Sequence, residues 1–325
     1  MMDRNTLTAL LLITLVLILT PYYMEMVSPP APIIEEFVGE EFKQDSQPVE
    51  YREYENISNK DSELITPPKS KKETTIKIEN DLYIATISSA CGGTIKSFEI
   101  KEHLKYDSGY VSLITPNNTK NLLIGFKDFN GNQIQLDDGW TLQSNADSYF
   151  IDVARSVTYT NTINNKLITK VLTFYPDKFL IDIDIDITAL ANNTLANNYT
   201  LTWFGGIPPT EKDSVTESTY FYSYIYQGGE LLDVKVGQGE TFSNNYTGQT
   251  DWVATRSKYF VTCLLDDSGG QFNSSTISAS YKNKELYDLS VSLQSNKVAN
   301  ISLYLGPLEY ERIKNLGVNL ESIMD

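Results

Sequence analysis

Short runs in which hydrophobic and polar residues alternate at every second position fill most of the chain after residue 74. Such alternation predicts β-strands that bury one face and expose the other. The runs lie at residues 74–79, 82–88, 94–100, 150–160, 166–175, 178–188, 219–226, 231–236, 259–265, 275–281, 285–293 and 297–305. Because this many strands exceed one comfortable open sheet, we expect an all-β protein with two large antiparallel sheets packed face to face.

The clearest of these runs is residues 181–187, where isoleucine and aspartate alternate without a break. Its isoleucines would point to one face of a sheet and its aspartates to the other. Side chains on one face of a strand are about 6.7 Å apart, which is too wide for one cation to be gripped by the row alone. We therefore expect a solvated carboxylate face rather than a metal site.

The first residues follow a different pattern, since residues 5–24 carry no charge. A helix of that length spans roughly 30 Å, the thickness of the hydrocarbon core of a bilayer. Residues 1–27 are therefore predicted to form a transmembrane anchor, with a cleaved signal peptide as the alternative. Residues 28–73 are acidic and proline-rich, and we expect them to form a disordered linker to a body at residues 74–306.

The last residues, 307–325, show the pattern of a short helix. Pro307 suits the first helical position, and Gly317 suits the left-handed position after the last turn. Tyr310, Ile313 and Leu316 fall on one stripe between them. We expect this helix to pack its stripe against the strand-rich body.

Composition narrows the possible chemistry. The 325 residues carry a formal net charge of −16, which disfavours binding to nucleic acid. The one histidine, His103, is expected at an exposed strand end, and a chain with a single histidine cannot build a multi-histidine metal site. Cys91 and Cys263 are either two buried thiols or a disulfide. We predict no catalytic residue, no metal site and no cofactor.

Four segments resemble, in order and spacing, the N-terminal part of the YidC membrane protein insertases of Bacteroidetes-type bacteria. The segments are residues 2–7, 82–98, 251–260 and 304–318. The positions that carry the similarity within the body are Gly92, Gly93, Lys96, Trp252, Tyr259, Phe260, Gly306 and Pro307.

This resemblance implies a large β-supersandwich of the galactose-mutarotase-like type, held in the periplasm by an anchor in the bacterial inner membrane. It implies that residues 307–325 form a coupling helix leading toward an insertase core of five further membrane spans, which receives nascent inner-membrane proteins. It also implies partners, namely the Sec translocon and SecDF-type accessory proteins. Because the chain ends before a second span, we expect a non-catalytic anchor and periplasmic portion.

One hypothesis about individual residues follows from the resemblance. The coupling helix would transmit docking through Glu309, Tyr310, Arg312, Ile313, Leu316 and Gly317. The alternative for these residues is the ordinary packing of a terminal helix on a sheet edge.

An alternative function is a membrane-anchored carbohydrate-binding or mutarotase-like sandwich. Exposed aromatic residues, such as Trp203, Trp252 and the tyrosines of 220–226, would then stack on sugar rings. Proton transfer in such an enzyme would depend on His103 alone, which gives this function little support.

Overall fold

The computed structural model describes residues 70–105, 109–115, 120–281 and 285–324, together with the isolated residues 13–15, 19 and 65. The chain divides into two compact units, Met1–Ser58 and Asn59–Asp325, and both sheets belong to the second unit. The predicted anchor at residues 1–27 and the predicted linker at 28–73 lie almost entirely outside the described residues. Within the described ranges, no helix has the length and apolar character needed to cross a bilayer.

Five strands form the smaller sheet, in the order β4-β3-β2-β1-β8. They are β1 (Thr75–Glu79), β2 (Tyr83–Ser88), β3 (Thr94–Leu104), β4 (Tyr110–Ser112) and β8 (Ser148–Phe150). All neighbours in it run antiparallel except β1 and β8, which are parallel. The prediction of a single strand at residues 150–160 was wrong, because the structure has two strands there, β8 and a later strand at Arg155–Ile163. The chain ends β8 with a bond from the Ile151 amide to the Glu79 carbonyl (2.7 Å) and then crosses to the other sheet.

The larger sheet has 14 strands. Twelve follow the order β6-β5-β12-β18-β17-β15-β16-β19-β11-β10-β9-β7, and the hairpin β13–β14 joins through β15. The strands are β5 (Leu123–Lys127), β6 (Gln133–Gln135), β7 (Thr141–Leu142), β9 (Arg155–Ile163), β10 (Lys166–Phe174), β11 (Leu180–Asp186), β12 (Asn198–Trp203), β13 (Tyr222–Gln227), β14 (Glu230–Val234), β15 (Thr241–Arg256), β16 (Phe260–Leu265), β17 (Phe272–Tyr281), β18 (Glu285–Gln294) and β19 (Ala299–Pro307). The helical pieces are α2 (Ser214–Ser218), α3 (Tyr310–Lys314), and the 3-10 turns η1 (Ala90–Gly92), η2 (Thr188–Asn193), η3 (Leu195–Asn197) and η4 (Leu320–Met324).

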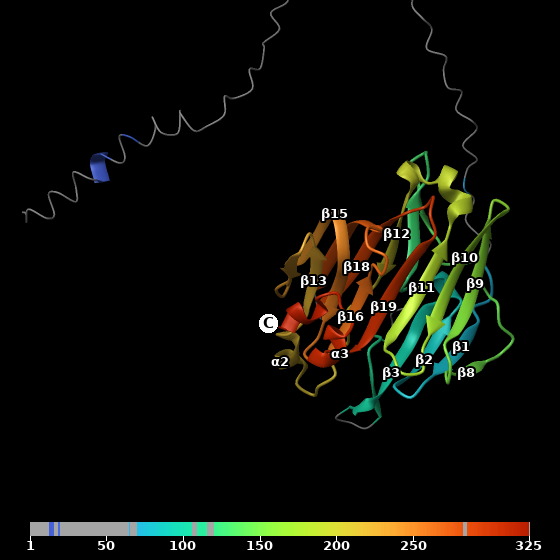
Figure 1. Ribbon diagram of the computed structural model, residues 1–325, viewed down its shortest axis with the longest axis horizontal. Helices are drawn as coiled ribbons and strands as arrows, with labels where there is room; N and C mark the ends of the chain where they lie inside the picture. Colours follow the sequence, from blue (N-terminus) through green and yellow to red (C-terminus); the bar gives the residue numbers. More distant parts are fainter. Residues whose placement is uncertain are drawn as a thin grey trace, which may run out of the picture. The chain divides into compact units, whose positions relative to one another are not determined.

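The smaller sheet packs on the part of the larger sheet formed by β9, β10 and β11, behind those strands in Figure 1. The turn between β2 and β3 shows how close the layers are. A Cβ atom on Gly92 would lie 2.7 Å from the Trp140 ring, and one on Gly93 would lie 2.9 Å from the Leu172 side chain. Both glycines also have positive φ, so the turn requires glycine for conformation and for space. The expected all-β antiparallel sandwich with few helices is confirmed.

Strand β11 is built as its alternating pattern predicts. Its inward isoleucines are fully buried, while its aspartates are partly exposed. Neighbouring groups use these carboxylates: Ser302 Oγ donates to Asp182 Oδ1 (2.9 Å), and Asn300 Nδ2 donates to Asp184 Oδ1 (2.5 Å). The aspartates therefore belong to a hydrogen-bonded, solvent-facing surface.

The lysine side chain of Lys170, in β10, lies in the core between the layers and is fully buried. Its Nζ donates to the carbonyls of Cys91 (2.7 Å) and Leu122 (2.6 Å), two residues with positive φ. Desolvation lowers the pKa of Lys170 to about 7. A neutral amine has two N–H groups, which matches the two carbonyls that it serves.

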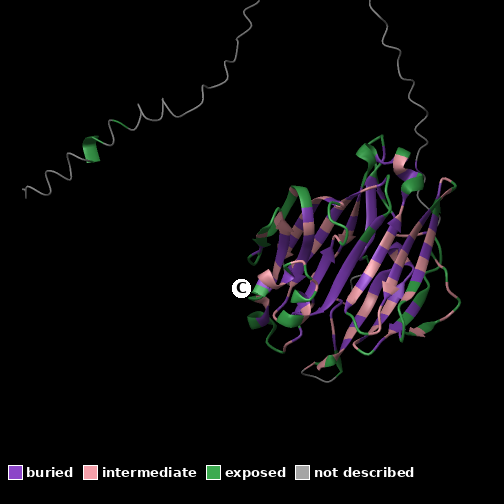
Figure 2. Cartoon of the chain, viewed as in Figure 1, coloured by how far each residue is buried: buried purple, intermediate pink, exposed green. Residues whose placement is uncertain are grey.

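Strands β16 and β19 differ from β11 because almost every residue in them is buried on both faces. All six residues of β16 are buried, as are all of β19 except Asn300, and these strands run purple through the middle of Figure 2. A strand covered on one face only would alternate. Their second face must therefore be covered, and the C-terminal segment lies beside it (Figure 1).

Candidate functional site: the docked C-terminal segment

The C-terminal segment, residues 308–324, leaves the larger sheet directly from strand β19. Pro307 is the last residue of that strand and pairs with Phe260, so the predicted helix start at Pro307 was wrong. Proline has no N–H to give to the ladder, and a strand end tolerates this. The Leu308 amide then donates to the Tyr259 carbonyl (2.7 Å), which carries the pairing one residue further.

The predicted single helix is instead two short pieces, α3 and η4. Glu309 is extended and precedes α3, which ends after Lys314. Gly317 has φ of 74°, the left-handed conformation predicted for it, and its amide bonds to the Lys314 carbonyl (3.0 Å). The chain reverses there and enters η4.

Apolar side chains seat both pieces in the same core as the sheets. Ile313 and Leu320 are fully buried, Ile323 is 2% exposed, and Leu316 packs against them. Tyr310 does not join this face: it is 45% exposed, and its hydroxyl accepts a bond from Lys314 Nζ (3.3 Å). The predicted stripe therefore holds for Ile313 and Leu316 and fails for Tyr310.

Polar bonds from β15 and β13 hold the reversal after Gly317. Trp252 Nε1 donates to the Val318 carbonyl (2.8 Å), and Arg256 Nη1 donates to the Ile323 carbonyl (2.5 Å). The Trp252 ring stacks on Tyr226 at 5.3 Å between centroids, and the Tyr226 hydroxyl accepts from Asn319 Nδ2 (3.0 Å). Trp252 is one of the positions that carry the similarity to the insertases. Arg256 and Tyr226 are not among those positions.

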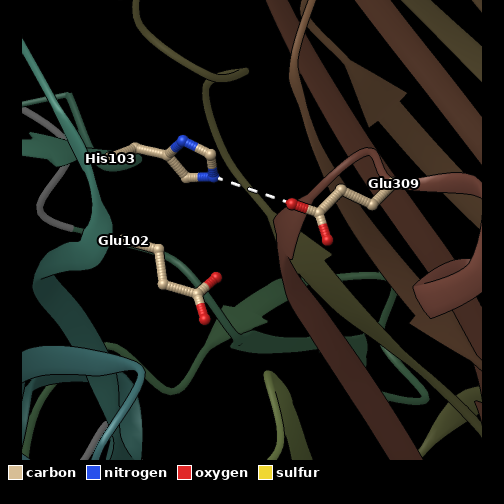
Figure 3. Close-up of side chains that lie close together, drawn as sticks. All are labelled: Glu102, His103 and Glu309. Carbon is tan, nitrogen blue, oxygen red and sulfur yellow. Dashed lines mark ion pairs between the residues drawn. The ribbon is translucent and has the colours of Figure 1, made fainter.

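A charged cluster ties α3 to the smaller sheet. Arg312 lies 3.0 Å from Glu309 and 3.1 Å from Glu102 of β3, and its guanidinium covers the Phe179 ring at 4.9 Å from the centroid. His103, next to Glu102, points its Nε2 at Glu309 Oε1 at 3.9 Å, as Figure 3 shows. The segment is thus bonded to both layers of the sandwich.

The same cluster is the one described group of side chains with metal-ligand character. Glu102, His103 and Glu309 each offer a ligand atom within 4.8 Å of the others. The Arg312 guanidinium already forms an ion pair with each of the two carboxylates, so a metal ion would have to displace it. The arrangement therefore suits a salt-bridged latch better than a metal centre.

A groove of about 600 Å³ opens beside this latch. Its wall includes Leu104, which is 72% exposed, and Tyr259, which is 42% exposed. Glu211 also lines the groove and accepts bonds from the Tyr259 hydroxyl and from Lys258 Nζ (3.1 Å). These two bonds, the one from Tyr259 first, lower the pKa of Glu211. Tyr259 is therefore a groove residue, while its neighbour Phe260 is buried.

The remaining predicted positions lie elsewhere or prove to be packing sites. Lys96 pairs with Glu73 (2.9 Å) near the turn between β2 and β3, not with the C-terminal segment. Gly306 packs on Phe179: an added Cβ would lie 2.7 Å from the Cγ atom of that ring. Cys91 and Cys263 are free, buried thiols.

Burial of the two tryptophans does not favour the alternative, sugar-binding function. Trp203 is 1% exposed and Trp252 is fully buried, so neither ring is available to a ligand. Among the tyrosines of 220–226, Tyr224 is also buried, whereas Tyr220 is 41% exposed.

Comparison with known proteins agrees with this architecture. Residues 75–325 match the family described as the YidC periplasmic domain. The chain belongs to this family. Full-chain alignments link it to proteins named membrane protein insertase YidC, at 28% identity in Prosthecochloris aestuarii and 27% in Chlorobium luteolum. The Chlorobaculum tepidum insertase is 30% identical over 78% of this chain. The chain spans 57% and 58% of the lengths of the first two relatives and 45% of the third.

Two solved structures are distantly similar to this chain. A candidate aldose 1-epimerase of Escherichia coli K12 aligns over 73% of this chain and 99% of its own at a TM-score of 0.42, with 9% identity. The Slr1438 protein of Synechocystis aligns over 74% and 97%, at a TM-score of 0.44 and 8% identity. TM-scores this low carry no argument about ligand or reaction.

Proposed function

We propose that this chain is the anchor and periplasmic portion of a YidC-type insertase, which inserts proteins into the bacterial inner membrane. Membership of the YidC periplasmic domain family and relatives named insertases support this proposal. The uncharged run at residues 5–24 supports an anchor. In this arrangement residues 1–27 span the inner membrane and the sandwich lies in the periplasm.

The proposed role of the sandwich is mechanical coupling without catalysis. The observation that supports it best is the attachment of the C-terminal segment to both sheets, through Arg312 to Glu102 and through Val318 to Trp252. The segment is bonded to the sandwich at Arg312 and at Val318, and it buries its own Ile313 in the core. We therefore expect it to hold the insertase core in a fixed orientation relative to the sandwich. Glu309, Leu316 and the Gly317 turn contribute to this rigidity.

The same proposal includes the fold type of the sandwich and the partner proteins of the insertase. We place the sandwich in the galactose-mutarotase-like supersandwich type, on its strand count and its two packed layers. The partners would be the Sec translocon and SecDF-type accessory proteins, with nascent inner-membrane proteins received by the insertase core. The groove between Leu104 and Tyr259 offers exposed apolar side chains near the latch for such a contact.

The test uses the full insertase that contains this chain. Arg312→Ala and deletion of residues 308–316 should reduce both the insertion of an inner-membrane substrate and the co-purification of SecDF-type proteins. Lys314→Ala is the matched control, because it removes a cation from the same helix whose described side-chain bond is to Tyr310 only. If the deletion leaves insertion and partner recovery unchanged, the coupling role is wrong.

A further inference from the structure

A small cavity away from the C-terminal segment contains an unusual buried acid. The cavity has a volume of about 150 Å³ and lies between α2, the loop at residues 206–209 and the start of β18. Its apolar lining residues are Ile207, Pro208, Pro209, Val215, Phe221 and Leu286, and the hydroxyl-bearing residues Thr115, Ser214, Ser218 and Tyr281 also line it. A cavity of roughly this volume accommodates a molecule the size of benzene.

Glu285, the first residue of β18, also lines this cavity. It is only 9% exposed, and its Oε2 atom is buried without a hydrogen-bond partner in the described part of the chain. Burial raises the pKa of Glu285 to about 7. An acid in this position lacks a donor that an ordinary buried carboxylate would have.

Two polar groups near Glu285 have partners of their own. Lys235, whose charge opposes the upward shift of the Glu285 pKa, donates its Nζ to the Thr219 carbonyl (2.5 Å) and covers the Tyr222 ring at 4.4 Å. The Tyr287 hydroxyl donates to the Phe221 carbonyl (3.2 Å). Neither group serves Glu285, so a ligand cation in the cavity would supply the donor that its Oε2 atom lacks among the described residues.

We propose that this cavity binds a primary ammonium group carried on a short apolar stem, with the ammonium donating to Glu285 and the stem lying against the prolines and Phe221. An anion would be repelled by Glu285 and by the −16 net charge of the chain, whereas a cation would be attracted. A stem of about five or six heavy atoms fills the volume, as a benzene-sized ligand would. A free alkylamine and the lysine side chain of a partner protein share this chemistry.

The first experiment measures binding to the purified full chain in a nonionic detergent by calorimetry. The probes are n-pentylammonium, n-pentanol and pentanoate, together with the peptide acetyl-Gly-Lys-Gly-amide as the protein source of the same group. We expect n-pentylammonium to bind at least tenfold more tightly than n-pentanol, and pentanoate not to bind. Binding of the peptide would assign the site to lysine side chains, and its failure beside a bound alkylamine would assign it to free amines.

Variants and pH then locate the site. Glu285→Gln should weaken n-pentylammonium binding at least tenfold. Asp288→Asn, the same charge change on the same strand, should leave it unchanged, because Asp288 serves the Gly205 amide (2.8 Å). With a pKa of about 7, Glu285 is roughly one-tenth ionised at pH 6 and nine-tenths at pH 8, so affinity should rise about ninefold between them. Glu285→Asp, which keeps the charge, should retain binding and controls for loss of fold.

Three results would overturn the proposal. They are equal binding of n-pentanol and n-pentylammonium, unchanged binding in a folded Glu285→Gln chain, and absence of binding by both the alkylamine and the peptide. The last result would mean that Glu285 stays protonated or is served by water.

Discussion

Arg312 and Glu102, which are 210 residues apart in sequence, form a 3.1 Å ion pair that joins α3 to strand β3. The pair connects the end of the chain to the smaller sheet, although the segment itself leaves from the larger one. Both side chains are partly exposed, at 30% and 40%. Solvent therefore screens the pair, and its value lies more in fixing position than in stabilising the fold.

A double-mutant cycle on Arg312→Ala and Glu102→Ala should give a coupling energy of about 0.5 kcal/mol, which falls as salt is added. Urea unfolding of the four proteins measures it. Lys314→Ala combined with Glu102→Ala should show no coupling. A coupling above roughly 2 kcal/mol would mean that the pair is far less solvated than its exposure indicates.

Trp252→Phe should keep the stack on Tyr226 but lose the bond to the Val318 carbonyl, costing about 1 kcal/mol. Trp252→Ala should cost about 3–5 kcal/mol, because it also leaves a cavity. Chemical unfolding gives both values. Limited proteolysis followed by mass spectrometry should show faster cleavage after Gly317 in both variants, and unchanged cleavage would contradict the anchoring role of Trp252.

Gly306→Ala should destabilise the fold by about 1–3 kcal/mol, since the new Cβ would lie 2.7 Å from Phe179. Gly206→Ala is the matched control, because its Cβ would make ordinary contacts at 3.6 Å or more and should change stability by less than about 1 kcal/mol. Thermal unfolding compares the two. Adding Phe179→Leu to Gly306→Ala should cost less than the sum of the single changes, and simple additivity would argue against the steric explanation.

Lys170 should make the folded state more stable as the pH rises above about 7. Its folded pKa of about 7 lies below the ordinary value of 10.5, so between these pH values the unfolded chain binds a proton that the folded chain does not. The contribution of Lys170 to the free energy of unfolding therefore rises with pH, by up to about 1.4 kcal/mol per pH unit, and does not change below about pH 7. Urea unfolding of the wild type and Lys170→Met from pH 7.5 to 9.5 tests it: the wild type should gain relative to the variant, and parallel pH profiles would contradict the buried neutral amine.

The alternating pattern predicted strands best where one face is buried and the other is wet. Strand β11 is such a case, and its position and facing were both predictable. Strand β15, the longest, was missed because its first half is mostly exposed on both faces, so its hydrophobic residues show no period there. The alternating pattern reveals a strand only where one of its faces is buried. It does not reveal a strand that is stabilised mainly by backbone hydrogen bonds to the neighbouring strands.

A short helical segment after the last strand was predictable, but its exact start and its partners were not. The helix signals around Pro307 were genuine local preferences, yet pairing with Phe260 extended the strand through Pro307 and delayed the helix to Tyr310. Local preference lost to a tertiary contact. The partners Glu102 and Arg256 could not be found by spacing, because only the folded sheets bring them to the segment.

Lys170 has a consequence for the order of folding. Its two carbonyl partners are 79 and 48 residues away along the chain, so neither bond can form before distant segments have met. Closing loops of this length costs entropy before the contacts form, so we expect both bonds to be absent from the folding transition state. Substitutions at Lys170 should therefore accelerate unfolding and leave the refolding rate nearly unchanged, which makes this amine a kinetic marker for the final closure of the two layers.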